Sequence, residues 1–182
     1  MCSSHTLSRY TDTGTATVAL AAQAGRSAWP EVLASLDHRA GPLYVTAPCV
    51  EWEPEYTDDQ LAQTRALAKL LLDPALDGPL PVVLAADLNA PPGSPEVRAL
   101  TDVMVDTWVA GGGDPLGVTL SSRNPFAPPE ARRQIDRRVD YVLARPGTSG
   151  RAVVVERAFA VETPVDGLPP SDHYPVVVDL LV

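Results

Sequence analysis

The chain has 182 residues, 45% of them hydrophobic and 20% charged; this is the balance of one globular domain that folds in water, and it excludes a disordered chain. Fourteen Lys and Arg residues against 23 Asp and Glu residues give a formal net charge of −9. Such a surface repels phosphate backbones at long range, so binding of long nucleic acid is not favoured.

The N-terminal residues and the two cysteines bear on the compartment. The first residues lack the basic start and the apolar stretch of a secretory signal, and no segment is apolar over the length of a membrane span. Cys2, at a terminus expected to fray, and Cys49 are the only cysteines, so we expect no disulfide framework. These features predict a cytoplasmic protein, unless a segment upstream of Met1 carries a signal. They predict no particular oligomeric state.

The first 46 residues predict short strands. Residues 15–22 and 43–46 are rich in β-branched or apolar residues and are bounded by Gly or Pro, a pattern typical of strands. The stretch 29–36 between them fits either a strand or a helix.

One clear helix and one buried strand follow. Residues 57–72 carry apolar side chains at helical spacing, and Asp73-Pro74 ends the run. Thr57, Asp58 and Asp59 are expected to supply capping oxygens and negative charge at its start. The continuous apolar run 81–87, which ends in Asp87, predicts a buried strand.

The second half alternates loops with strands. Ser94 and Pro95 are a capping hydroxyl and a proline at the first helical position, so a short helix to about residue 102 is expected. Residues 111–113 and 124–130 predict loops. Three further strands are predicted at residues 139–143, 152–160 and 174–181. The alternation predicts one mixed α/β domain over residues 1–182.

Three polar clusters lie at the ends of predicted strands, where a sheet presents side chains to a ligand. They are Asp-Leu-Asn at 87–89, Arg-Val-Asp-Tyr at 138–141 and Ser-Asp-His-Tyr-Pro at 171–175. Extended backbone would turn Asp87 and Asn89 to the same face, so that a carboxylate and an amide could share a metal ion or a phosphate.

Each cluster alone also fits a structural role. Asp87 and Asn89 precede an Ala-Pro-Pro-Gly sequence and are ordinary turn formers. Asp140 fits an exposed strand residue paired with an arginine at position 132, 133, 137 or 138. A lone histidine such as His173 is more often structural than catalytic. Together, however, the clusters offer a base for water, stabilisation of charge and a cation site, which phosphate-ester hydrolysis requires.

In this order, the clusters resemble motifs of the endonuclease/exonuclease/phosphatase superfamily. Ala-Asp-Leu-Asn at 86–89 resembles G-D-F-N, Arg-Val-Asp-Tyr-Val at 138–142 resembles R-I-D-Y-I, and Ser-Asp-His-Tyr-Pro-Val at 171–176 is similar to S-D-H-Y-P-V. Leu7-Ser8-Arg9 looks like the L-S-R segment of the family. The resemblance thus covers nearly the whole chain.

The resemblance implies a DNase-I-like four-layer α/β/β/α sandwich, with the site in a cleft at the ends of two mixed sheets. It implies Mg²⁺- or Mn²⁺-assisted hydrolysis of a phosphomonoester or a phosphodiester. By this resemblance, Asp87 activates or orients the attacking water, Asp172 is a metal ligand, and Asp87 and Asn89 also assist the metal. Asn89 would contact the phosphate as well. His173 would stabilise the transferring phosphoryl group, while Asp140 would bond to His173 and fix its tautomer.

The chain departs from the family pattern in two places. The family's early asparagine strand and its Gln-Glu strand, whose glutamate is a principal metal ligand, have no counterpart before Leu7. The resemblance therefore implies a domain that is incomplete at its N-terminus and that binds Mg²⁺ more weakly. The T-H-L segment of the family aligns with Pro48-Cys49-Val50, so Cys49 stands where a phosphate-contacting histidine is usual.

Two functional hypotheses follow. The first is a metal-dependent phosphoesterase. The second is a catalytically inactive fragment or a phosphate-binding module of the same fold, which the missing glutamate favours for the isolated chain. Because the motifs contact only phosphate and metal, they predict no particular phosphate ester as the substrate.

Overall fold

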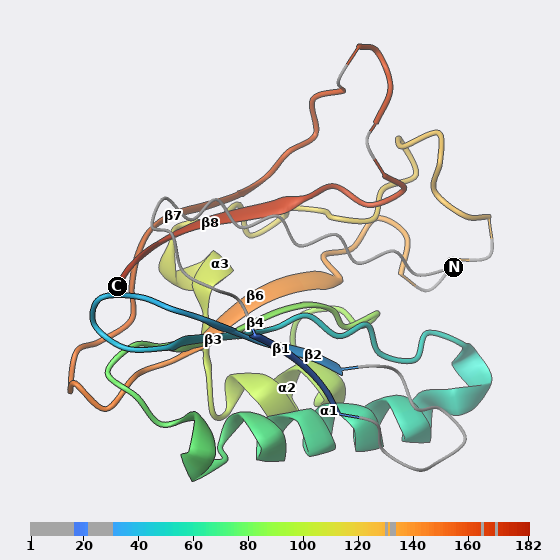
Figure 1. Ribbon diagram of the computed structural model, residues 1–182. Helices are drawn as coiled ribbons and strands as arrows, with labels where there is room; N and C mark the ends of the chain where they lie inside the picture. The colour runs from blue at the N-terminus through green and yellow to red at the C-terminus, as the bar shows by residue number, and fades with distance from the viewer. Residues whose placement is uncertain (1–16, 22–30, 130, 132–133, 165, 170) are drawn as a thin grey trace.

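The computed structural model describes residues 17–21, 31–129, 131, 134–164, 166–169 and 171–182 (Figure 1). A six-stranded sheet with the order β1-β2-β3-β4-β6-β5 forms its centre. The strands of this sheet are β1 (Thr17–Ala21), β2 (Glu31–Leu36), β3 (Leu43–Thr46), β4 (Val82–Asp87), β5 (Val105–Asp106) and β6 (Asp140–Arg145).

Only one neighbouring pair in this sheet, β3 with β4, is parallel. Parallel strands need a crossover connection, and helix α1 (Thr57–Leu71) supplies it. Short 3-10 helices at Pro54–Tyr56 and Pro74–Leu76 flank α1. The crossover places the end of β4 next to the chain that follows β3, where Cys49 forms an isolated parallel bridge with Asp87.

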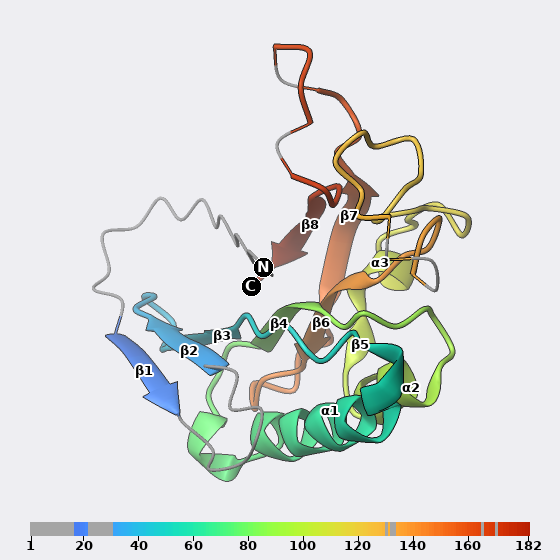
Figure 2. The ribbon, with the colours of Figure 1, turned by 90° about the vertical axis from the view of Figure 1, so that its right-hand side faces the viewer.

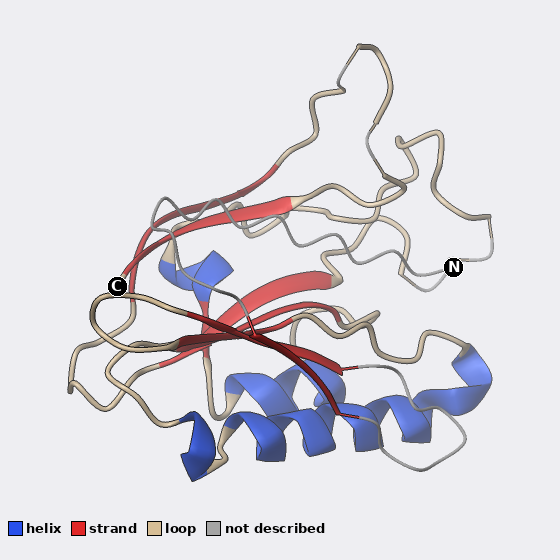
Figure 3. Ribbon diagram, viewed as in Figure 1, coloured by secondary structure: helices blue, strands red, loops and turns tan. Residues whose placement is uncertain are grey.

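Two helices cover one face of the large sheet (Figure 3). They are α1 and α2 (Pro95–Thr101). The core between these helices and the sheet is apolar and includes Leu67, Leu71, Val82, Leu84, Ala86, Val97, Leu100, Tyr141 and Leu143. Because side chains alternate along a strand, the residues between these core positions on β4 and β6 face the opposite side of the sheet.

On that opposite side lies a second, two-stranded sheet (Figure 2). It pairs β7 (Val154–Ala160) with β8 (Val176–Leu181) in antiparallel fashion, with a register shift between Val155 and Arg157. The four-residue helix α3 (Thr107–Ala110) packs against both β6 and β7. The helical layer and the two sheets of the expected arrangement are therefore present.

Most predicted elements are confirmed within one or two residues. The ambiguous segment 29–36 is a strand from Glu31 onward, and the predicted hydroxyl cap of Ser94 accepts from Val97 N at 3.3 Å. The predicted cap of α1 is wrong, because Tyr56 is its N-cap residue and makes no side-chain cap. Thr57 instead donates its hydroxyl to Pro54 O at 2.9 Å. The prediction for Leu7-Ser8-Arg9 lies outside the described residues.

Strand β5 and helix α3 were not predicted. With two and four residues, each is too short to show a periodic pattern. Among the described residues, no helix is long and apolar enough to cross a membrane.

Candidate active site

Two of the predicted site residues are cross-strand partners. Asp87 ends β4, Asp140 begins β6, and the two are directly paired in the antiparallel register. Both alternate with residues of the helix-facing core, such as Ala86 and Tyr141, so both carboxylates point to the face turned away from α1 and α2. The sequence places them there because each follows or precedes an apolar run that fixes the register of its strand.

His173 reaches the same place from the connection between β7 and β8. Its Nδ1 lies 2.9 Å from Asp140 Oδ2, so the hydrogen bond expected between these two residues is present. Ligand atoms of Asp87, Asp140 and His173 all lie within 4.8 Å of one another. The alternative pairing of Asp140 with Arg138 is wrong, because Arg138 pairs with Asp106 at 2.7 Å. Arg132 and Arg133 lie outside the described residues.

Asn89 lies beside Asp87, although not through strand alternation. Its φ of 48° is left-handed, so the extended backbone ends at Asp87, and the predicted period-two geometry is wrong. Asn89 N donates to Asp87 Oδ1 at 2.9 Å, the hydrogen bond of an Asx turn. Its side-chain Nδ2 donates to Val50 O at 3.0 Å and contacts Cys49 Sγ at 3.7 Å. The turn-former interpretation of this cluster is therefore confirmed, and Asn89 lies next to the candidate site.

Cys49 also borders the site. Its Sγ lies 3.7 Å from Asp87 Oδ2, so the residue that replaces the aligned family histidine faces the same carboxylate. Cys49 is disulfide-bonded, so the expectation of no disulfide is wrong.

Asp172 is not a member of the group formed by Asp87, Asp140 and His173. Its Oδ1 accepts from the Ser171 hydroxyl at 3.0 Å. Its negative charge nevertheless reaches the group, because it raises the pKa of both Asp87 and His173. Asp172 thus borders the site on the side of the loop that carries His173.

The electrostatics of the three central groups are linked. Burial, followed by the charge of Asp140, raises the pKa of Asp87 to about 7, although the charge of His173 opposes this. Burial lowers the pKa of His173, but the hydrogen bond and charge of Asp140 outweigh burial and raise it to about 9. At neutral pH the imidazole is therefore protonated, while Asp87 exchanges between its acid and its carboxylate.

The donor set fits a hard divalent cation. Carboxylate oxygens of Asp87 and Asp140 are close together, and such oxygens are the ligands that Mg²⁺ and Mn²⁺ prefer. The raised pKa of Asp87 shows that its negative charge is poorly compensated by the protein alone. A cation at this carboxylate would provide that compensation.

Two residues that sequence reasoning missed hold the site together. Thr119 accepts hydrogen bonds at its Oγ1 from Val139 N at 3.0 Å and Asp140 N at 3.1 Å. Asn124, which is buried, donates its Nδ2 to Ser171 O at 2.9 Å and to Asp172 O at 3.0 Å. Asn124 begins a segment predicted as a loop, Thr119 stands in a stretch for which no element was predicted, and no local pattern marks their distant partners. Burial of a polar loop residue marks it as a structural partner, and burial is visible in the structure but not in a single sequence.

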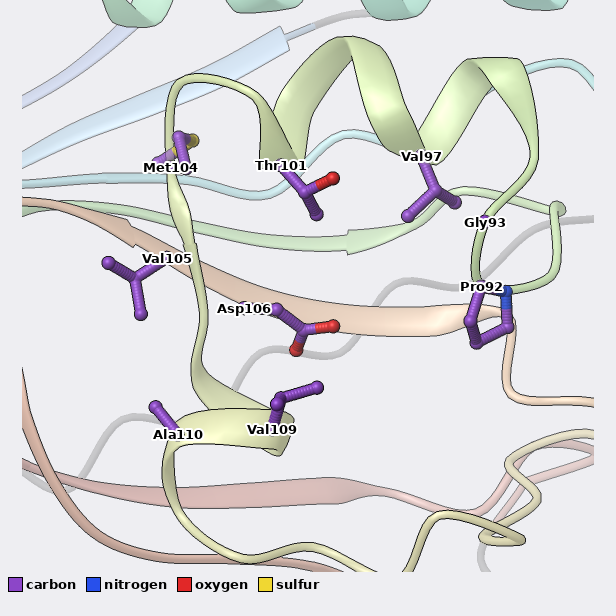
Figure 4. Close-up of a pocket in the computed structure, with 9 residues that line it drawn as sticks. All are labelled: Pro92, Gly93, Val97, Thr101, Met104, Val105, Asp106, Val109 and Ala110. Atoms are coloured by element: carbon purple, nitrogen blue, oxygen red, sulfur yellow. The ribbon is translucent and has the colours of Figure 1, made fainter.

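A cavity of about 430 Å³ lies elsewhere, between α2, β5 and α3 (Figure 4). Its lining is mostly apolar and includes Val97, Met104 and Val109, with Asp106 as its one acidic side chain. None of the predicted site residues lines it. Asp106 is instead bonded to Arg138, which precedes β6, so this cavity is separate from the candidate site.

Comparison with solved structures identifies the fold. The chain is similar to a crystal structure of humanized D. rerio TDP2 (14% identity, TM-score 0.68, 92% of this chain and 66% of that one). It is also similar to truncated Caenorhabditis elegans TDP2 (16% identity, TM-score 0.66, 92% and 65%) and to an endonuclease/exonuclease/phosphatase from Bacteroides vulgatus (17%, 0.64, 92% and 65%). The chain spans slightly less than two thirds of the length of these structures. The expected DNase-I-like α/β fold is confirmed.

Comparison with sequences gives a narrower result. No curated protein matches the chain. The model of the Endonuclease/Exonuclease/phosphatase family matches residues 5–173, a range that holds all three polar clusters up to His173. The chain therefore belongs to the endonuclease/exonuclease/phosphatase family.

Proposed function

We propose that the protein is a phosphoesterase that hydrolyses phosphate esters with the help of a divalent cation. One observation carries the proposal: Asp87, Asp140 and His173, from three separate segments, bring their ligand atoms within 4.8 Å of one another. Placing the two carboxylates this close costs electrostatic energy, and perturbed groups of this kind cluster at functional sites.

Each central residue has a role that its environment supports. Asp87, with a pKa of about 7, suits a general base that orients and deprotonates water near neutral pH. His173, protonated at that pH, would stabilise the negative charge that develops on the phosphoryl oxygens. Asp140 would hold the imidazole through Nδ1, which leaves Nε2 to face the substrate.

Asp87, whose carboxylate lies beside that of Asp140, would hold the cation, which is Mg²⁺ or Mn²⁺. Asp172 and the side chain of Asn89, which border the site, would complete its ligands. When bound, the cation would neutralise charge on the phosphate and orient it. Asn89 would reach the phosphate or the cation from the turn that also fixes Asp87.

The charge of the protein favours a compact phosphate ester over long nucleic acid. A net charge of −9 repels an extended phosphate backbone. One similar structure, of D. rerio TDP2, is described as complexed with single strand DNA product. A short strand or a strand end carries fewer phosphates to repel, so it stays within the proposed substrate class.

The test is hydrolysis of bis(p-nitrophenyl) phosphate and p-nitrophenyl phosphate with Mg²⁺ or Mn²⁺ and with EDTA. We expect metal-dependent turnover that falls about 100-fold or more in His173→Gln and in Asp87→Asn. Matched controls are His38→Gln and Asp179→Asn, which replace a half-buried histidine outside the site and the surface partner of Arg157; both should keep wild-type rates.

The opposing hypothesis is a phosphate-binding module without turnover. It predicts phosphate binding by calorimetry that weakens in His173→Gln, together with no hydrolysis above the uncatalysed rate. Hydrolysis that persists in both site variants would show a contaminating enzyme and would remove the proposal.

A further inference from the structure

The outer edge of β6 is completed by side chains where no strand reaches it. Strand β5 pairs with only two residues of β6, Leu143 and Ala144. Nearer the start of β6, the side-chain hydroxyl of Thr119 accepts from Val139 N at 3.0 Å and from Asp140 N at 3.1 Å. Thr119 is fully buried, so no water can replace this acceptor without rearrangement.

The backbone of the same residue binds the segment that carries His173. Tyr174 N donates to Thr119 O at 2.7 Å, and Leu120 forms an isolated antiparallel bridge with His173. On its other side, Leu120 bridges to Arg137, and both Thr119 N and Leu120 N donate to Arg137 O. Residues 119–120 therefore lie between the chain that leads into Asp140 and the chain that holds His173.

We propose that Thr119 is a positioning residue, whose hydroxyl and carbonyl hold the backbone of Asp140 and the backbone beside His173 at the separation that lets these two side chains bond. Three hydrogen bonds connect these residues in a ring. Thr119 Oγ1 to Asp140 N is 3.1 Å, Asp140 Oδ2 to His173 Nδ1 is 2.9 Å, and Tyr174 N to Thr119 O is 2.7 Å. Removing the Thr119 hydroxyl breaks one hydrogen bond of this ring and leaves two buried N–H groups without their acceptor.

The expected loss of activity rests on the proposed function, but the expected change in the Asp140–His173 hydrogen bond does not. Positioning errors of a fraction of an ångström reduce the rate of the chemical step more than they reduce substrate binding. The loss should therefore fall on kcat and leave KM nearly unchanged.

The chain offers a matched control on the same strand. Thr107 is also fully buried, and its Oγ1 donates to Val142 O at 2.6 Å. It thus bonds to the backbone of β6 two residues from Asp140, and within the described part of the chain its hydroxyl has no hydrogen bond to the segment that holds His173. Thr107→Val reproduces the loss of a buried threonine hydroxyl without breaking the ring of hydrogen bonds at the site.

The experiment compares Thr119→Val, Thr119→Ser and Thr107→Val. Kinetics with bis(p-nitrophenyl) phosphate give kcat and KM, and one-dimensional proton NMR of the metal-free protein follows the downfield Nδ1 proton of His173, assigned by its absence in His173→Gln. We expect Thr119→Val to lower kcat about 10- to 100-fold, with KM changed less than about 3-fold, and to lose or broaden the downfield signal. Thr119→Ser should restore both, and Thr107→Val should keep both even if it lowers the melting temperature equally.

Three results would overturn the proposal: an unchanged downfield signal in Thr119→Val, failure of Thr119→Ser to restore it, or equal loss in Thr107→Val. Thr119→Ala removes the same acceptor with less bulk, and it takes the place of Thr119→Val if circular dichroism shows that variant unfolded. If the wild type has no turnover, the proposed function fails, while the NMR comparison still decides the role of Thr119.

Discussion

Asp87 and Asp140 stand directly opposite each other across the antiparallel pair of β4 and β6. Like charges at such positions destabilise a sheet, and the structure relieves the repulsion by pairing Asp140 with His173 at 2.9 Å. The charge of His173 and the hydrogen bond from Asn89 N lower the pKa of Asp87, but burial and the charge of Asp140 outweigh them. The site therefore contributes less to folding than an apolar pair would at the same positions.

This relationship predicts that Asp87→Asn stabilises the metal-free protein as pH rises. The pKa of Asp87 is about 7 in the folded state against a usual value of 3.8, so the unfolded chain ionises first. Folded stability is then lost between pH 4 and pH 7 and stays lower above pH 7. An asparagine does not ionise, so its stability advantage should grow by roughly 2–4 kcal/mol over that range. Urea unfolding in EDTA at pH 4, 5.5 and 7 measures it; an advantage that does not vary with pH would contradict the electrostatic explanation.

The rate of hydrolysis should follow a bell-shaped pH profile. Activity should rise as Asp87 ionises, near pH 7, and fall as His173 loses its proton, near pH 9. Positive charge favours a carboxylate, so added Mg²⁺ should move the acid limb to lower pH. Profiles of kcat/KM at several Mg²⁺ concentrations test this, and an acid limb that stays fixed would show that the cation does not bind near Asp87.

Asp140→Asn should uncouple His173 from its partner. The hydrogen bond and charge of Asp140 hold the pKa of His173 at about 9, against the opposing effect of burial. Without that charge, the pKa should fall from about 9. We expect kcat to fall about 10- to 100-fold at pH 7, and NMR titration of His173 to show the lower pKa. Asp179→Asn is the matched control, and an unchanged titration in Asp140→Asn would refute the coupling.

The buried pair of Arg138 and Asp106 should matter to stability as a unit. Arg138 donates to both carboxylate oxygens, at 3.2 and 2.7 Å, with only 6% of its side chain exposed, and it stacks on Trp108 and Tyr141. Asp106→Asn alone should lower the free energy of unfolding by about 3–5 kcal/mol, because it leaves a buried cation without its partner. Adding Arg138→Met should restore most of that loss.

Urea unfolding of both variants tests this prediction. Asp179→Asn, which breaks the exposed pair with Arg157, should cost less than about 1 kcal/mol. If the double variant is no more stable than Asp106→Asn alone, the cation is not the source of the loss.

The elements that the sequence predicted well are those with local signals. The strand that ends in Asp87 is a continuous apolar run, and α2 begins at a hydroxyl followed by a proline. Strand β5 has no such signal, because it exists through pairing with β6 and through the bond from Asp106 to Arg138. Interactions between distant segments of the chain, which have no periodic pattern, decide such elements.

The candidate site divides in the same way. Asp87, Asp140 and His173 were predicted because each stands at the end of an apolar run. Asn89 was assigned to the site by strand alternation, but its left-handed backbone places it there by a turn. Thr119 was missed because its side-chain partners lie 20 and 21 residues away, and a buried hydroxyl leaves no mark on the sequence that distinguishes it from a surface one.

The connection between β7 and β8 is fixed at both of its ends. Val161 N donates to Pro175 O at 2.9 Å, and Asn124 Nδ2 donates to the carbonyls of Ser171 and Asp172. Insertions or deletions between these anchors would leave the imidazole of His173 where it is. We therefore expect this connection to tolerate changes in length more readily than the segments that anchor it.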